Sequence, residues 1–413
     1  MTARKPALLF VFFVLLIDVL GFGLLVPVLP SLVMKLQGGG EAEATPIVTS
    51  LIATYAAMVF LFSPLLGALS DRYGRRPVLL LSMLGSGLDY FAMALAPTVP
   101  WLFVTRALNG LTGASVTAAS AYIADVTTPE KRAAGFAIIG AAFGLGFTLG
   151  PVLGGVLSQV HLTLPFYAAG SLALLNAAFG LFVMPESLPK ERRNPSSPRS
   201  PFAALTVLRQ YPLARRLAFA LFFLQLAQFA LHGSWALYTR YRYGWNETEI
   251  GLSLCAVGLG AVIVQGGLLR RIVPRIGERR AVVIGVVLVI LGYIGYGIAP
   301  VGWVIYAAIA VQSLGGIAGP SCQALISKSV RADEQGVVQG SLTSVQGLAN
   351  IFGPLLGGAL LAWSIASSRA QPIPGVLFYG CAALATIGLA IAVVVLRMTP
   401  AAVPPSSAQR TSP

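Results

Sequence analysis

The chain has 413 residues, of which 56% are hydrophobic and only 10% are charged, and its formal net charge is +14. A mean hydropathy of +0.80 excludes an ordinary soluble domain. The basic excess does not indicate a nucleic-acid partner, because most of the 28 Lys and Arg residues are confined to short segments between apolar runs.

Apolar stretches of about 20 residues, each long enough to cross a bilayer core of about 30 Å, recur along the whole sequence. Helices satisfy their own backbone hydrogen bonds, so we predict an all-α integral membrane protein with twelve transmembrane helices. The first run is too long for a signal peptide, and we expect it to be retained. The predicted spans are 7–34, 47–70, 78–97, 99–124, 132–158, 164–184, 217–239, 249–269, 281–300, 302–327, 336–363 and 374–397.

The basic segments alternate with the spans. With the N-terminus inside, the inner loops and tails collect most of the Lys and Arg residues, and the outer loops hold few. This positive-inside bias predicts that both termini are cytoplasmic. It also favours contact with anionic membrane lipid.

The sequence repeats itself at a fixed offset. Gly144-Leu145 followed by Gly150-Pro151 reappears 203 residues later as Gly347-Leu348 followed by Gly353-Pro354, and Gly74 falls on Gly277. Two homologous six-helix halves in parallel orientation are indicated. The predicted organisation is an N-terminal bundle over 1–185, a basic cytoplasmic linker over 186–216 with a short helix near Phe202–Gln210, a C-terminal bundle over 217–398, and a disordered cytoplasmic tail over 399–413.

Three charges lie inside predicted spans of the first half: Asp18, Asp89 and Arg106. A charge at bilayer depth costs at least about 2.5–3.5 kcal/mol and usually marks an ion or substrate route. A buried carboxylate can exchange protons near neutral pH, whereas a neighbouring arginine favours its ionised form. These residues are therefore candidates for proton coupling or substrate binding. Helix-packing hydrogen bonds are the alternative.

The second half has no counterpart to these charges. It offers uncharged polar and aromatic residues instead, which suggests proton handling in the first half and substrate contact in the second. A lone helical histidine is more often a packed polar residue than a titrating site. The weaker candidates for a substrate cavity are Gln225, Gln228, His232, Trp235 and Gln312.

Two further sequence segments indicate particular local structures. The loop between the second and third spans begins at Gly67, which allows close helix approach, and Gly74 permits a tight turn. Asp71 is expected to form a latch across the domain interface, and the charged partners in the loop are Arg72, Arg75 and Arg76. In the fifth span, small residues clear one stripe for close backbone packing and a proline bends the helix. This stripe consists of Gly144, Gly150, Pro151, Gly154 and Gly155.

These segments resemble the major facilitator superfamily, and within it the twelve-span drug:proton antiporters of the bacterial tetracycline-efflux group. The first span resembles that group's motif at Asp18, Gly21, Gly23, Pro27 and Pro30. The fourth resembles the proton-linked motif at Arg106-x-x-Asn109-Gly110.

The resemblance implies that Asp89 and Asn109 join Asp18 and Arg106 in proton coupling, and that Asp125 and Arg132 join the loop in a charge network. It also implies that the glycine stripe, packed against the eleventh span, seals the inside against proton leak.

The chain departs from the group in the ninth span, where Val289 replaces an acid. This puts tetracycline, which the group exports as a metal chelate, in question as the cargo, and cationic or neutral lipophilic compounds are equally well indicated. The resulting expectation is a monomeric, proton-driven exporter of amphipathic small molecules in a bacterial inner membrane, with no cofactor, no resident metal and no enzymatic activity. A proton-linked importer or facilitator of a sugar or metabolite is the alternative.

Overall fold

The computed structural model describes residues 5–113, 115–128, 132–193, 200–331, 334–366, 373 and 375–398, and within these ranges the regular elements are all helices. The first half contains α1 (Lys5–Leu25), α2 (Leu29–Gln37), α3 (Glu41–Tyr73), α4 (Arg75–Ala94), α5 (Val99–Thr112), α6 (Ser115–Val126), α7 (Arg132–Val160) and α8 (Leu164–Val183). The second contains α10 (Pro212–Tyr243), α11 (Glu247–Ile263), α12 (Leu269–Ile276), α13 (Glu278–Ile298), α14 (Gly302–Leu314), α15 (Ala318–Lys328), α16 (Gln335–Ile365) and α17 (Val376–Met398).

In the described chain, ten helices are long and apolar enough to cross a membrane, and the pair α1–α2, bent by 44°, makes up to eleven. The predicted span 99–124 forms two shorter helices, α5 and α6, on either side of Gly113. The eighth span is continuous but passes through a π-helical turn at Val264–Leu268 between α11 and α12. Such turns locally widen a helix and often lie at functional positions. The all-α membrane fold predicted from hydropathy is confirmed.

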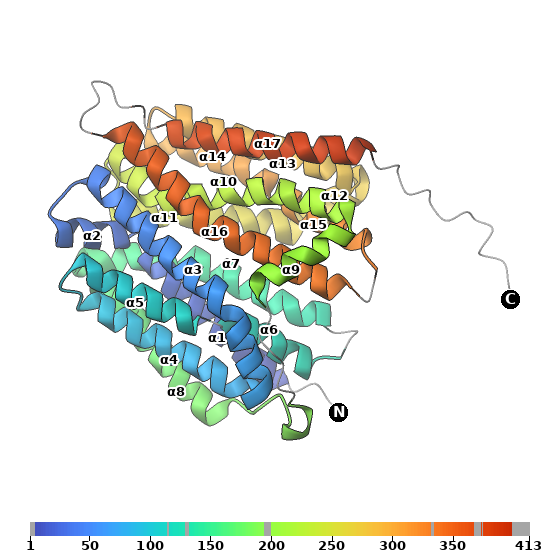
Figure 1. Cartoon of the computed structure of the whole chain (residues 1–413). Helices are drawn as coiled ribbons and strands as arrows, with labels where there is room; N and C mark the ends of the chain where they lie inside the picture. Colours follow the sequence, from blue (N-terminus) through green and yellow to red (C-terminus); the bar gives the residue numbers. More distant parts are fainter. Residues whose placement is uncertain are drawn as a thin grey trace.

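The linker contains the short helix expected from its sequence. It consists of α9 (Pro201–Val207), continued by a 3₁₀ turn at Leu208–Gln210. Ser200 begins the helix by accepting a hydrogen bond from the Phe202 amide. Figure 1 shows α1–α8 and α10–α17 as two groups of helices, with α9 beside α16. The Phe202 ring of α9 packs edge-on against Phe60 of α3, with 5.4 Å between ring centroids, so the linker touches both halves.

The glycine stripe of α7 packs on α1. A Cβ at Gly150 would lie 2.8 Å from the Leu20 carbonyl oxygen, and one at Gly154 would collide with Leu24. The repeat behaves alike: Gly353 and Gly357 of α16 approach the backbone of α10. Small residues are what allow such close packing in membranes.

The neighbouring glycine of each stripe faces the opposite half. Gly155 of α7 lies against the backbone of Glu247 on α11, and Gly358 of α16 lies against Thr49 of α3. The close contact that α7 makes with the other half, which we call the seam, is therefore with α11, the eighth span. The expectation that it is made with the eleventh was wrong, because a bare stripe in a sequence shows which face is open but not which helix covers it.

We call the end of the molecule that carries the α3–α4 turn, the linker and the end of α17 the basic end. Arg76 at the start of α4 donates to the Leu181 carbonyl near the end of α8. The repeat-related Arg279 at the start of α13 donates to the Leu396 carbonyl near the end of α17, at 3.4 Å. Each half thus uses an arginine to satisfy a carbonyl at the end of its last helix, where such groups lack intrahelical partners.

Candidate functional site

The centre of the first half contains a buried ion pair. Arg106 on α5 pairs with Asp89 on α4, and both side chains are almost fully buried. Asn109, one turn further along α5, donates from Nδ2 to Asp89 Oδ2 at 2.6 Å. Within the described chain, the second oxygen of Asp89, Oδ1, is buried without a hydrogen-bond partner. A buried polar atom without a partner is costly, and such atoms in a folded protein often mark a functional position.

Helix α5 can present these side chains because it lies close to α3. A Cβ at Gly110 would stand 2.7 Å from the Tyr55 carbonyl oxygen, so only glycine fits there. The guanidinium of Arg106 lies over the Tyr55 ring, 5.6 Å from its centroid, which adds a cation–π contact to the ion pair with Asp89.

Asp18 belongs to the same neighbourhood. It lies close enough to Tyr55 and Tyr90 to interact with them electrostatically, and Arg106 lies near the same Tyr55. A Cβ at Gly21 on α1 would lie 3.0 Å from the Tyr90 hydroxyl, so glycine there leaves room for the tyrosine. The structure therefore brings Asp89, Arg106 and Asn109 into one cluster, with Asp18 near the two tyrosines beside it. No sequence motif indicated these tyrosines, Tyr55 and Tyr90.

The second half carries an uncharged polar cluster. Gln228 Nε2 and His232 Nε2 on α10 are 2.7 Å apart, and the Tyr293 hydroxyl donates to Gln228 Oε1 at 3.3 Å. The His232 ring also packs against Phe147 of α7, with 5.9 Å between centroids, so this cluster reaches the boundary between the halves. An amide, an imidazole and aromatic rings suit an amphipathic ligand with few charges.

The other predicted cavity residues separate. Gln312 accepts a hydrogen bond from the Tyr296 hydroxyl at 2.8 Å, and within the described chain its buried Nε2 has no partner. Gln225 lies nearer the basic end, in a small cavity of about 20 Å³ with Gln323, Gln339 and Gln346. Trp235 is 2% exposed and donates to Ser253 Oγ at 2.9 Å. It packs against Tyr296 and Phe378 in the aromatic core of its half, and contact with substrate stays a prediction for this residue.

At the basic end, Arg75 is the centre of the loop's charge cluster. It pairs with Asp71 at 2.6 Å and with Asp125 of α6 at 3.1 Å. Glu186 accepts the backbone amides of Arg75 and Arg76, and so caps the start of α4. These contacts lie within the first half and the first residue of the linker. A latch to the other half is a prediction that they do not test.

The remaining loop residues differ in their surroundings. Arg72 lies over the ring of Tyr73. Gly67 has no described atom within 4 Å of where a Cβ would stand, so the close approach expected there is not present. Gly74 has φ +110°, and a Cβ there would collide with Glu186. Arg132 begins α7, but its side chain is outside the described residues.

The repeat carries a second version of the Arg75–Asp125 pair with the signs exchanged. Residues 203 positions later are Glu278 and Lys328, and they form an ion pair at 2.5 Å. Gly277, the counterpart of Gly74, also has a positive φ of +80°. Both halves therefore share the glycine turn and an ion pair that joins their third and fourth spans. The positions of the acid and the base in that ion pair are exchanged between the halves.

The opposite end of the molecule is closed by polar contacts between the halves. Arg240 of α10 lies 3.7 Å from Glu41 of α3 and donates to Glu247 of α11 at 2.9 Å. Ser31 of α2 donates to Glu247 and accepts from Arg240. We call these four residues the outer cluster, and sequence analysis did not find it because its members belong to four separate helices.

A helical membrane fold in two repeated halves, with a buried charge cluster in one of them, defines a membrane transporter. The chain belongs to the Major Facilitator Superfamily, whose sequence model matches residues 11–307 and 217–413. This confirms the resemblance inferred from the motifs.

Among its relatives, the chain is 39% identical over 349 residues to the tetracycline resistance protein, class C, of Escherichia coli, covering 84% of this chain and 88% of the relative. It is 33% identical to the class B protein of Escherichia coli, covering 83% of this chain and 85% of the relative.

Solved structures share the fold. The human organic anion transporter MFSD10 is 26% identical, with a TM-score of 0.71, covering 95% of this chain and 100% of that one. A bacterial homolog of the human lysosomal transporter Spinster, in an inward-facing and occupied conformation, is 15% identical with a TM-score of 0.77, covering 97% and 98%. At that identity the likeness shows the fold alone.

Proposed function

We propose that this chain is a proton-coupled antiporter that exports amphipathic small molecules by alternating access. The buried Asp89–Arg106–Asn109 cluster is the observation that carries this proposal, because a paired charge at this depth is costly to keep without a transport role. The family and the names of the relatives support drug efflux in particular.

The proposed coupling step follows from the geometry of the cluster. When Asp89 takes up a proton, Arg106 loses its negative partner while remaining buried, which is unfavourable by several kcal/mol. Asp18, which lies near Tyr55 as Arg106 does, would then be the carboxylate that Arg106 approaches. Movement of Arg106 between the two acids would displace α5 relative to α1 and α3, and so connect the proton to the arrangement of the helices.

We place the basic end in the cytoplasm of a bacterium and the outer cluster on the far side of the inner membrane. The distribution of Lys and Arg supports this orientation. In it, the described conformation is closed on the outside by the outer cluster. The transporter would work as a monomer, with no cofactor and no nucleic-acid partner, on the proton gradient alone.

The uncharged cluster of Gln228, His232 and Tyr293 is the proposed substrate contact in the second half. In the ninth span, α13, Val289 packs near Gly315 and supplies no carboxylate. Cationic and neutral lipophilic compounds are therefore candidates beside tetracycline.

The test is a substrate screen in inverted membrane vesicles, with and without an imposed pH gradient, using tetracycline, a cationic dye and a neutral lipophilic dye. We expect gradient-dependent uptake of at least one of them, and its loss in Asp89→Asn. Glu191→Gln, which removes an exposed carboxylate of the linker, is the matched control and should transport normally. Gradient-dependent uptake at the normal rate by Asp89→Asn would overturn the proposal, and accumulation only in right-side-out vesicles would favour an importer.

A further inference from the structure

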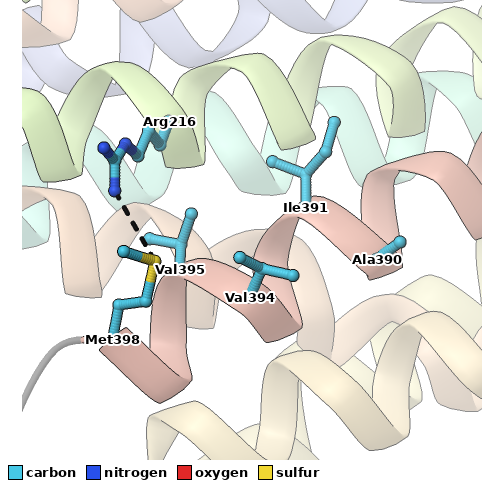
Figure 2. A pocket seen from close by; sticks show the side chains of 6 residues that line it. All are labelled: Arg216, Ala390, Ile391, Val394, Val395 and Met398. Atoms are coloured by element: carbon cyan, nitrogen blue, oxygen red, sulfur yellow. Dashed lines mark hydrogen bonds between the residues drawn. The ribbon is translucent and has the colours of Figure 1, made fainter.

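A groove lies on the lipid-facing side of the second half, at the basic end. It is formed between the start of α10 and the last turns of α17, and its volume is about 490 Å³. Figure 2 shows the Arg216 side chain at one end of the groove next to Met398, with Ile391 and Ala390 toward the other end. Apart from Arg216, the lining is apolar.

The apolar lining follows one face of α17. Residues 390, 394 and 398 are four apart, so they lie along one side of the helix over about 12 Å. Val394 is 56% exposed and Met398 is 66% exposed. More than half of each of these side chains is uncovered, and in a membrane that part faces acyl chains.

Arg216 lacks an acidic partner among the described residues. The contact shown for its guanidinium is a weak hydrogen bond to the thioether of Met398, at 3.9 Å. A guanidinium carries five N–H donors, so most of its capacity is unused. Its position five residues into α10, beside the last residue of α17, places it at the level where the helices leave the bilayer.

The surroundings of the groove are basic. Arg397 lies in the last turn of α17, and Arg279 of α13 donates to the Leu396 carbonyl. Glu278, the acid next to Arg279, is already paired with Lys328. The mouth of the groove is therefore positively charged and can attract an anion, whereas the rest of its lining is apolar.

We propose that this groove is a binding site for one anionic phospholipid, with the headgroup phosphate on Arg216 and an acyl chain along the 390–398 face of α17. Guanidinium groups bind phosphate in bidentate geometry. Basic residues next to transmembrane helices attract anionic lipid by about 1 kcal/mol each. A zwitterionic lipid could fill the groove, but the arginines around it would add little to its binding free energy.

The experiment is native mass spectrometry of the purified full chain titrated with phosphatidylglycerol or with phosphatidylcholine. The wild type should retain one phosphatidylglycerol with higher affinity than phosphatidylcholine. Arg216→Gln should weaken phosphatidylglycerol binding on the order of fivefold, corresponding to the loss of about 1 kcal/mol. Arg215→Gln is the matched control, because it removes the same charge from the adjacent exposed residue, which does not line the groove.

A second variant tests the body of the groove without changing its charge. Ala390→Trp fills the groove from a position that faces lipid, so it should fold normally and bind phosphatidylglycerol less well. The proposal is overturned if Arg216→Gln binds like the wild type, if phosphatidylcholine binds equally tightly, or if Ala390→Trp has no effect. Displacement of the lipid by inorganic phosphate, beyond the effect of sodium chloride at equal ionic strength, would overturn it by showing a site for free anions.

Discussion

Arg240 of α10 approaches Glu41 of α3, with 3.7 Å between Nε and Oε1, and this pair joins the two halves of the molecule at the end away from the linker. The same guanidinium also holds Glu247 of α11, whose carboxylate receives Ser31 of α2. Because the cluster spans the boundary, it can persist only while that end is closed. It should therefore stabilise the closed state relative to the open one.

We expect Arg240→Ala to shift the conformational equilibrium toward opening at this end by about 1 kcal/mol, the upper range for partly exposed ion pairs. Spin labels at Lys35 and Val301, which lie at this end in opposite halves, would report a larger population of long distances by double electron–electron resonance. Arg242→Ala removes the same charge from the same helix end outside the cluster and should leave the distances unchanged. Equal distributions for Arg240→Ala and the wild type would contradict a role in closure.

The Asp89–Arg106 pair gives a prediction about stability. Removing one partner leaves the other charged and buried, which typically costs about 3–5 kcal/mol. Asp89→Asn and Arg106→Gln should each lower the unfolding midpoint in detergent, and the double variant should lose less than the sum of the two. The coupling energy from this double-mutant cycle is the measurement. Additive losses would mean that the two side chains do not interact in the folded protein.

The sign-exchanged ion pairs predict an asymmetry between the halves. Exchanging the charges of the second pair, with Glu278→Arg and Lys328→Asp together, keeps an ion pair and should preserve folding and transport. The same exchange in the first pair, with Arg75→Glu and Asp125→Arg, places the new acid beside Asp71, which has no counterpart because the repeat has Pro274 there.

We therefore expect the double exchange at Glu278 and Lys328 to be tolerated. The double exchange at Arg75 and Asp125 should reduce transport severely, measured in vesicles at matched protein levels. Single exchanges at Lys328 and at Asp125 serve as controls and should both be harmful, since each sets like charges against each other. Equal tolerance of the two double exchanges would contradict the role assigned to Asp71.

The two repeat-related glycines should differ in their tolerance of a side chain. Gly74 and Gly277 both have positive φ, so an alanine at either position costs about 1–3 kcal/mol of backbone strain. A Cβ at Gly74 would in addition collide with Glu186, whereas no described atom lies within 4 Å of a Cβ at Gly277. Gly74→Ala should lower the thermal unfolding midpoint more than Gly277→Ala, and the reverse order would contradict this account.

The sequence by itself determined the membrane fold, because hydropathy and the self-sufficiency of helices leave one architecture for recurring apolar stretches. It also determined the repeat, since Gly74 and Gly277 are required by the same backbone conformation in both halves. The short linker helix was predictable from its local pattern. In the same way, charges inside apolar runs are visible without coordinates because they conflict with their surroundings.

Only the tertiary structure decided which groups meet. Asp18 and Asp89 both lie inside apolar runs, so the sequence does not show which of them pairs with Arg106. The packing of α4 against α5 makes Asp89 the partner. The outer cluster unites four helices whose spacing along the chain carries no periodic signal, and Trp235 of α10 meets its partner Ser253 on α11 only in the folded chain. Periodicity fixes the face of a helix on which a residue lies, whereas the helix that covers this face is chosen by the packing of the whole bundle.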